Sequence, residues 1–173
     1  MRRFLNVPYD EEELLSLEAG DQVFITGTVY VGRDQVHKRL YDAILKGDEI
    51  PFQFKGNAIY YMGPSPAPDG FAIGAAGPTT SMRMDPFTPL LMEKGLRLVI
   101  GKGPRKQEVA EAIRKHKGVY LVAYGGCGAL YSSKIASSEV VAFPELGPEA
   151  LLRLEVKDFP AFCMIDSSGK SAI

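Results

Sequence analysis

Two hydrophobic patterns follow one another repeatedly along this chain. Between residues 22 and 31, valine and isoleucine recur at alternate positions, which is typical of a strand. From residue 35 to 46, and again from 105 to 116, apolar side chains recur at the spacing of one face of a helix. Strands and helices mixed in this way predict an α/β domain.

Capping residues and helix breakers set the limits of these elements. Asp34 is expected to cap the helix over 35–46, and Gly47 to end it. Gly118 is expected to end the helix over 105–116. Asp85-Pro86 is expected to open a further helix, with proline in its first turn, and Gly95 to end it. That helix covers residues 87–94, and two others are expected over 11–17 and 129–135. Other strands are expected over 58–62, 71–74, 97–100, 119–123, 140–143, 152–156 and 161–165.

Length and charge exclude several classes of protein. A chain of 173 residues is expected to form one domain, residues 1–173, with a sizeable core. Its net charge of −1 gives no electrostatic reason to bind nucleic acid or an anionic membrane. No apolar run approaches the roughly 20 residues of a spanning helix, and Met1–Leu5 lacks the longer apolar core of a signal peptide. The expected location is therefore the cytoplasm.

The cysteine count limits the metal chemistry of the chain. Its two cysteines, Cys127 and Cys163, show no close metal-ligand spacing and are expected to be small, buried or half-buried side chains. An iron–sulfur cluster needs three or four thiolates. We therefore expect this chain to hold no metal by itself.

Two loops combine glycine with hydroxyl or cationic side chains just after predicted strands. The first, Gly77–Asp85, joins a Gly-Pro turn to Thr79, Thr80 and Ser81 and then to Arg83. The second is Gly101-Lys102-Gly103, which lacks the spacing of a P-loop. Loops at strand ends are where α/β folds hold ligands, and arginine can grip a carboxylate through two parallel hydrogen bonds. The two loops are therefore candidates for binding a small anion.

These motifs and others, in order, resemble the β region of iron–sulfur hydro-lyases, which forms the C-terminal half of class I fumarases and the β subunit of two-subunit fumarases and L-tartrate dehydratases. Gly32 departs from the pattern, because alanine is expected there. The resemblance implies a swivelling β/β/α domain, with two β layers and one helical layer. The matching pieces are Gly20-Asp21, Val23–Gly27, Gly32–Leu40, Tyr60–Pro64, Gly77–Asp85, Gly101–Gly103, Tyr124–Leu130, Phe159-Pro160 and Ile165-Asp166.

The resemblance implies roles for the cationic side chains. Arg33 would bind one carboxylate of a dicarboxylic acid and Arg83 the other. Without the resemblance, Arg33 reads as a surface residue paired with Asp34 or Glu49, and Arg83 as paired with Asp85. Lys102 would supply a positive charge to a carboxylate or to a developing carbanion.

The resemblance also implies roles for the hydroxyl groups and a histidine. Thr79 would act at the carbon that loses or gains a proton, whereas a threonine in such a loop is more often a capping residue. Thr80 and Ser81 would hydrogen-bond beside it. His37, one turn beyond Arg33, is a second candidate for proton transfer, although a lone helical histidine is more often structural. A turn at Tyr124-Gly125-Gly126 is expected to shape the floor of the pocket.

Carried over as a whole, the resemblance implies the β subunit of an iron–sulfur fumarate hydratase, which interconverts fumarate and L-malate. A [4Fe-4S] cluster would be bound by three cysteines of an α subunit, so this chain would be inactive alone. An α2β2 assembly would be expected, or a homodimer of this chain when isolated. L-tartrate dehydratase stays open as an alternative, as do a non-catalytic dicarboxylate-binding module and an interaction protein without a ligand.

Overall fold

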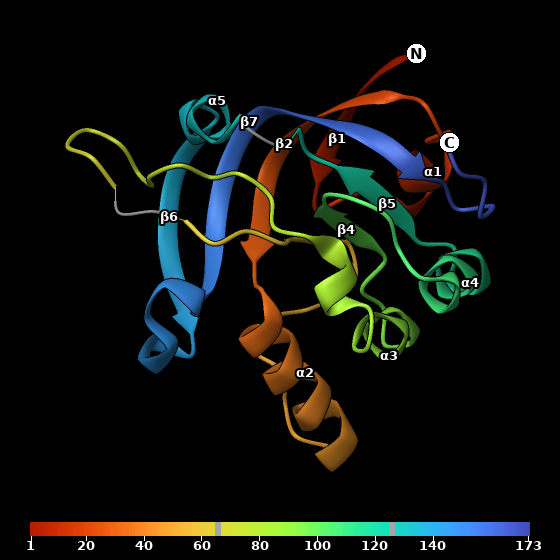
Figure 1. The fold of residues 1–173 in the computed structure, drawn as a ribbon, viewed down its shortest axis with the longest axis horizontal. Helices are drawn as coiled ribbons and strands as arrows, with labels where there is room; N and C mark the ends of the chain where they lie inside the picture. Colours follow the sequence, from red (N-terminus) through yellow and green to blue (C-terminus); the bar gives the residue numbers. More distant parts are fainter. Residues whose placement is uncertain (65–66, 125–126) are drawn as a thin grey trace.

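The fold is one mixed sheet with helices packed mainly on one side of it, as a computed structural model shows for residues 1–64, 67–124 and 127–173 (Figure 1). The strands are β1 (Arg2–Val7), β2 (Gln22–Val31), β3 (Ala58–Tyr60), β4 (Leu98–Gly101), β5 (Val119–Val122), β6 (Ile135–Ala142) and β7 (Leu151–Ile165). The helices are α1 (Glu11–Leu15), α2 (Asp34–Lys46), α3 (Thr88–Glu93), α4 (Gln107–His116) and α5 (Gly128–Ser133), with short 3-10 helices η1 (Ser81–Met84) and η2 (Pro144–Glu149).

The sheet closes on itself. Its strand order is β1-β2-β3-β4-β5-β7-β6, and β7 also pairs with β2, so that β2, β3, β4, β5 and β7 form a ring. Strands β1 to β5 run parallel to one another, whereas β7 runs antiparallel to β2, β5 and β6. The predicted α/β class and mixed sheet are confirmed. The barrel-like closure does not confirm the separate layers of the swivelling β/β/α fold.

Successive residues of the central strands face two different cores. Along β4, Leu98 and Ile100 point into the ring, while Val99 faces the helices. Along β5, Leu121 points inward and Tyr120 outward. This period of two is what a pleated strand requires when both of its faces are covered. The ring is therefore filled by side chains, and the second core lies between its parallel strands and the helices.

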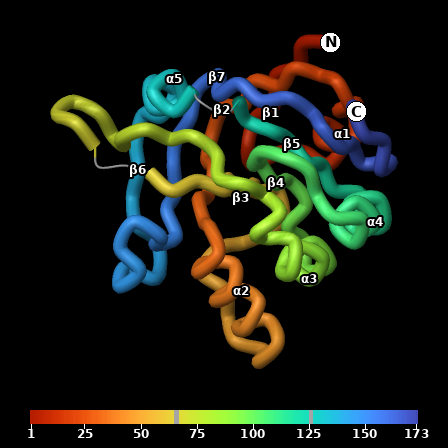
Figure 2. Tube along the Cα trace, in the orientation of Figure 1, coloured from red at the N-terminus to blue at the C-terminus, as the bar shows by residue number. Residues whose placement is uncertain are grey.

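The helices α2, α3 and α4 lie on the same side of β3, β4 and β5 (Figure 1). On another side, the chain between β3 and η1 runs out past β6 and beside α5 (Figure 2). It is held there by the Ser132 hydroxyl, which donates to the Ile73 carbonyl at 2.9 Å, and by the Ala76 N–H, which donates to the Gly128 carbonyl at 3.1 Å. This places Gly77 and the residues after it at the carboxyl ends of β3 and β4.

Most predicted elements are present, and several limits change. Helix α2 has Arg33 rather than Asp34 at its N-cap, and α4 ends on left-handed Lys117 rather than on Gly118. Residues 71–74 form no strand, while β1 and η1 were not predicted. The two strands expected over 152–156 and 161–165 are one continuous strand, β7. Within the described ranges, no helix has the length and apolar content needed to cross a membrane.

Candidate functional site

The two predicted ligand loops lie side by side at one edge of the sheet. Beyond β3, the Thr79 N–H donates to the Tyr61 carbonyl at 2.8 Å. Thr80 forms a parallel bridge with Lys102, and the Ser81 N–H donates to the Lys102 carbonyl at 3.0 Å. Residues 79–81, which lead into η1, thus pair with the chain just beyond the ends of β3 and β4. This backbone pairing places Thr79, Thr80 and Ser81 beside Lys102.

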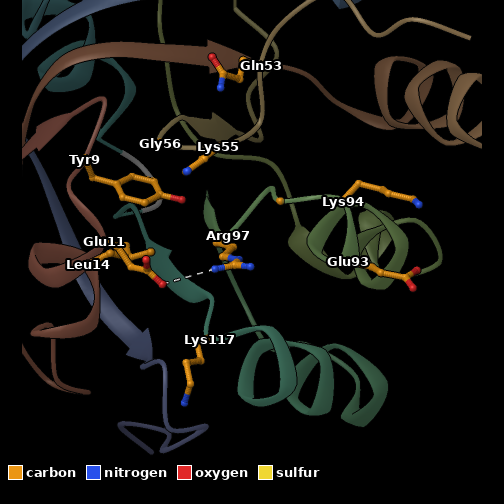
Figure 3. A pocket seen from close by; sticks show the side chains of 11 residues that line it. Tyr9, Glu11, Leu14, Gln53, Lys55, Gly56, Glu93, Lys94, Arg97 and Lys117 are labelled. Carbon is orange, nitrogen blue, oxygen red and sulfur yellow. Dashed lines mark ion pairs between the residues drawn. The ribbon is translucent and has the colours of Figure 1, made fainter.

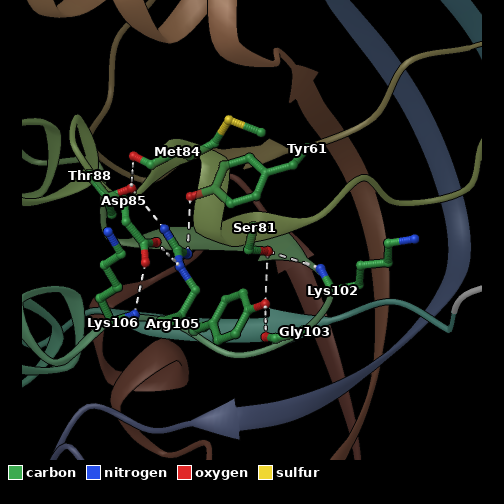
Figure 4. Close-up of polar contacts among 10 residues, drawn as sticks. Tyr61, Ser81, Met84, Asp85, Thr88, Lys102, Gly103, Arg105 and Lys106 are labelled. Atoms are coloured by element: carbon green, nitrogen blue, oxygen red, sulfur yellow. Dashed lines mark hydrogen bonds and ion pairs between the residues drawn. The ribbon is translucent and has the colours of Figure 1, made fainter.

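These four side chains differ in their access to a ligand. Thr80 is exposed, and Thr79 and Lys102 are partly exposed, whereas Ser81 is fully buried. The Ser81 hydroxyl accepts a hydrogen bond from the Lys102 N–H at 2.9 Å and lies 2.8 Å from the Tyr120 hydroxyl. Among the described residues, the Lys102 ammonium has no hydrogen-bond or ion-pair partner, and its side chain leads away from that buried contact (Figure 4). Lys102 is therefore free to meet an anion, and Ser81 supports the loop.

Arg83 lies on η1 and reaches the start of α2. Its Nε and Nη2 groups donate to the same Asp34 oxygen at 3.0 and 2.8 Å. The Arg83 side chain is 51% exposed. The partner is Asp34 rather than Asp85, so the ion pair ties the Thr79 loop to the β2–α2 turn. The carboxylate that the sequence assigned to capping α2 makes this contact.

Arg33 occupies the turn between β2 and α2 and pairs with η2. Its Nη2 lies 3.2 Å from the Glu149 carboxylate, so neither Asp34 nor Glu49 is the partner seen here. The guanidinium also lies flat against Gly63, where a Cβ would sit 2.1 Å from the Arg33 Nη1. Only glycine leaves room for the guanidinium in this position. Arg33 and Arg83 thus flank the start of α2.

His37 lies beneath Arg33 and does not reach the surface. The side chain is 1% exposed, and its Nδ1 lies 2.7 Å from the Arg33 carbonyl. Because a carbonyl only accepts, Nδ1 carries the proton. Burial lowers the pKa of His37 to about 4, so the ring is neutral at pH 7. A neutral ring that hydrogen-bonds to backbone fits a supporting role better than the predicted proton transfer.

Arg105 was not identified from the sequence, and it is the most connected side chain of this region (Figure 4). It is fully buried with Asp85, at a distance of 2.6 Å between Nε and Oδ1. The sequence placed Arg105 at the start of a predicted helix, where an arginine is usually solvated, and gave no sign that it pairs with Asp85. Asp85 was expected to open a helix, and in the structure its carboxylate neutralises the buried Arg105 guanidinium.

The cysteines do not fit an iron–sulfur cluster. Burial raises the pKa of the Cys163 thiol to about 12, so it is not a thiolate at neutral pH. Cys127 is the N-cap residue of α5. In the part of the chain that the structure describes, no three His, Cys, Asp or Glu side chains gather as metal ligands. Gly125 and Gly126, assigned to the pocket floor, lie outside the described residues.

A hollow of about 890 Å³ lies at the opposite edge of the sheet, before β3, β4 and β5. It contains none of the predicted site residues. The Arg97 guanidinium pairs with Glu11 at 3.7 Å, and the charged ends of Lys94 and Lys117 point away from the hollow (Figure 3). Lys55 lies on the Tyr9 side of the hollow, and Arg97 is already paired with a carboxylate (Figure 3).

The arrangement places cationic and hydroxyl side chains near the carboxyl ends of β2, β3 and β4. Arg33 and Arg83 are each paired with a carboxylate, Glu149 and Asp34 respectively. Among the described residues, the Lys102 ammonium has no such partner. An anion at this edge would meet Lys102 and the N–H donors that the two arginines leave free.

Comparison with known proteins gives consistent matches. The family model described as the fumarase C-terminus matches residues 2–173. The chain is 41% identical over 169 residues to the class I anaerobic fumarate hydratase of Escherichia coli, covering 95% of this chain and 31% of that protein. It is 38% identical over 169 residues to fumarate hydratase 2 of Leishmania major, covering 95% and 30%.

A smaller protein matches over most of its length. The chain is 35% identical over 178 residues to the L(+)-tartrate dehydratase subunit beta of Escherichia coli, covering 100% of this chain and 87% of that subunit. The chain therefore spans about a third of the fumarate hydratases that it matches, and nearly the whole of a subunit from a two-subunit enzyme.

Proposed function

This chain belongs to the fumarase C-terminus family, and from that premise we propose that it is the β subunit of a hydro-lyase that reversibly adds water to fumarate to give L-malate. The observation that carries the proposal is the pairing of the Thr79–Ser81 segment with the Lys102 loop, through the Thr80–Lys102 bridge, with Arg83 following on η1. Fumarate and malate carry two negative charges each. A site with several cations and one held hydroxyl suits such a substrate.

In this proposal the two arginines bind the two carboxylates of the substrate. Each guanidinium now contacts a resident carboxylate through its Nε and Nη2 atoms, Asp34 for Arg83 and Glu149 for Arg33. A planar guanidinium has five N–H donors, so the remaining ones can still bind a second carboxylate. Holding both ends of a four-carbon acid fixes its central carbons relative to Thr79.

Thr79 is the proposed proton acceptor and donor at one of those carbons. A threonine hydroxyl is a weak base unless its environment stabilises the alkoxide. Lys102 is the cation best placed to do so, because its loop is bridged to the Thr79 segment and its ammonium has no partner among the described residues. Lys102 would also stabilise negative charge that develops on the substrate.

The iron–sulfur cluster of this enzyme class is proposed to belong to an α subunit, since the two cysteines of this chain do not form a ligand set. The closeness in length to a tartrate dehydratase β subunit supports a separate partner chain, and α2β2 is the proposed assembly. The same match supports L-tartrate as the second candidate substrate.

We also retain the swivelling β/β/α architecture, over a single domain of residues 1–173, as part of the proposal. It is supported by the helical layer of α2, α3 and α4, by the parallel strands beneath it, and by the antiparallel β6–β7 pair on the far side of the ring.

The test is an anaerobic assay with both chains. This chain is co-expressed with an α-type partner, iron and sulfide are restored, and fumarate formation from L-malate is compared with oxaloacetate formation from L-tartrate. Activity that requires both chains supports the proposal, and the better substrate identifies the enzyme. A fully assembled enzyme inactive on both acids, combined with dicarboxylate binding by this chain alone, would favour a non-catalytic binding module.

Two substitutions test the assigned roles in that assay. Arg83→Ala should lower kcat/KM roughly 100-fold, because it removes a charge-assisted contact to substrate. Thr79→Val should lower kcat by about 100-fold or more with little change in KM. Arg39→Ala is the matched control, since Arg39 is a surface arginine of α2 paired with Glu145. Near-normal turnover of Arg83→Ala would contradict its role.

A further inference from the structure

Arg105 is the centre of a buried polar network directly beneath the candidate site (Figure 4). Its Nε donates to Asp85 at 2.6 Å, its Nη1 to the Tyr61 hydroxyl at 3.3 Å and its Nη2 to the Thr88 hydroxyl at 2.8 Å. The guanidinium also lies between two rings, 5.2 Å from the centroid of Tyr61 and 4.9 Å from that of Tyr120. One side chain thus connects β3, β5, η1 and α3.

From Arg105, contacts continue into both loops of the site. Tyr61 accepts the Thr79 N–H on its backbone carbonyl at 2.8 Å. The Tyr120 hydroxyl lies 2.8 Å from the Ser81 hydroxyl and 2.8 Å from the Gly103 carbonyl. Each of the two tyrosines that flank the Arg105 guanidinium therefore contacts a different part of the backbone of the two loops.

The directions of the hydrogen bonds around Tyr120 can be assigned because one of its partners, the Gly103 carbonyl, can only accept. The Gly103 carbonyl must receive the phenol proton, because a carbonyl has none to give. Ser81 then donates its own proton to the Tyr120 oxygen and accepts the Lys102 N–H at 2.9 Å. Burial raises the pKa of Tyr120 to about 12, which keeps the phenol proton in place at neutral pH. The network has one consistent arrangement.

Stability alone does not require these groups. A buried Arg–carboxylate pair is often no more stabilising than apolar side chains of similar volume, because both charges lose their hydration. What the guanidinium adds is a rigid planar fork of donors with fixed directions. Asp85 completes the arrangement by also accepting the Lys106 N–H at 2.8 Å. The result is a fixed relative geometry for β3, β5, η1 and α3 beneath the site.

We propose that Arg105 is a positioning residue: through Tyr61 and Tyr120 it holds residues 79–81 and 101–103 in the relative placement that the reaction needs. The expected effect on kcat rests on the proposed function, whereas the expected effect on the two loops does not. Arg105 is buried and meets no substrate; it acts through the backbone that carries Thr79 and Lys102.

Tyr120→Phe is the first variant to test, because it removes a single oxygen and leaves the Arg105–Asp85 pair intact. In the full chain, alone and assembled with its partner, hydrogen exchange at the Ser81 and Lys102 amides should become at least about 10-fold faster. Amides in the centre of β7 should not change. Equal protection of residues 79–81 and 101–103 in variant and parent would overturn the proposal.

The kinetic arm uses the assembled enzyme. Tyr120→Phe and Arg105→Lys should each lower kcat by about 10-fold while KM changes less than about twofold, the pattern of misplaced catalytic groups. Tyr120→Phe combined with Ser81→Ala should lose little more than either alone, because they share one hydrogen-bonded chain. Unchanged kcat in the presence of faster exchange would refute the positioning role.

Asp166→Asn is the matched control. Asp166 is also a buried carboxylate with several hydrogen bonds, including one from the Ala19 N–H at 3.0 Å, but it lies after β7 at the opposite edge of the sheet. Its variant should lose stability without a selective loss of kcat. If the parent assembly turned over no dicarboxylate, the proposed function would fail, and the exchange measurement alone would decide whether Arg105 holds the loops.

Discussion

At the residue scale, the site depends on partners that lie far away in the sequence. Arg33 pairs with Glu149 and Arg83 with Asp34, whereas sequence proximity suggested Asp34, Glu49 and Asp85. The sequence predicted that the two loops would be neighbours, and backbone pairing between residues 79–81 and Lys102 joins them. It did not predict the ion-pair partners of the arginines, because these depend on which elements meet in space.

Gly63→Ala should weaken substrate binding without unfolding the protein. An added Cβ would meet the Arg33 guanidinium, the mobile end of a flexible side chain, so the guanidinium should move and the fold remain. We expect KM for the dicarboxylate to rise about 10-fold and the free energy of unfolding to change by less than about 1 kcal/mol. In an Arg33→Ala background the same substitution should add little, and a full additional loss would show that Gly63 acts elsewhere.

His37 should make the protein less stable in mild acid. Its pKa is about 4 in the folded protein against an ordinary value of 6.5, so the unfolded chain takes up a proton that the folded one does not. Stability should therefore be complete above pH 6.5 and fall by about 3 kcal/mol as the pH is lowered toward 4. Urea unfolding at pH 7 and pH 5 measures this fall.

The control for that measurement is the other histidine. Partial burial and the nearby Lys115 lower the pKa of His116 as well, so His116→Gln should remove a smaller part of the pH dependence and His37→Gln most of it. For Asp21 and Asp166, burial raises the pKa, but hydrogen bonds to the carboxylates outweigh it, so the pKa of each is lowered. The stability that these two carboxylates contribute is therefore lost only below their ordinary pKa of 3.8. A His37→Gln variant with an unchanged slope would contradict the assignment.

At the element scale, periodic segments were predictable and irregular ones were not. The range of β2 matches the prediction because its alternation is long and its ends are clear. Strand β1 has only two buried side chains, Leu5 and Val7, which is too short a pattern to recognise. The sequence predicted two strands in place of β7 because Asp158 and Pro160 are residue types that usually end a strand. In the structure Asp158 is indeed left-handed. Pairing with β2 continues across both residues.

The turn from β2 into α2 explains the one departure from the family pattern. A Cβ on Gly32 would lie 2.6 Å from the Val36 Cγ1 and 2.9 Å from its Cβ, so Val36 occupies the space that an alanine would need. Gly32→Ala should cost roughly 1–3 kcal/mol of unfolding free energy. Combining it with Val36→Ala should cost less than the sum of the two single changes in urea unfolding. Simple additivity would argue against this contact as the cause.

At the scale of the whole molecule, the two cores share their strands and should unfold together. Leu121 lies in the ring and Ile113 between α4 and the sheet, and both are fully buried. Replacing either by alanine should lower the free energy of unfolding by about 2–5 kcal/mol. Tyrosine fluorescence and far-UV circular dichroism should report one coincident transition. Two separated transitions in either variant would contradict a single cooperative domain.

The closure of the ring by β7 has a consequence for how the protein is made. The strand that seals the ring, β7, follows all of its partners along the chain, so β2 and β5 are synthesised before it. Until β7 is available for pairing, β2 presents an unpaired edge and the ring core stays open to water. The ring core can therefore form only after β7 has been synthesised. Slow translation of the segment before β7 prolongs this aggregation-prone state, and chaperones that cover strand edges should lower its cost.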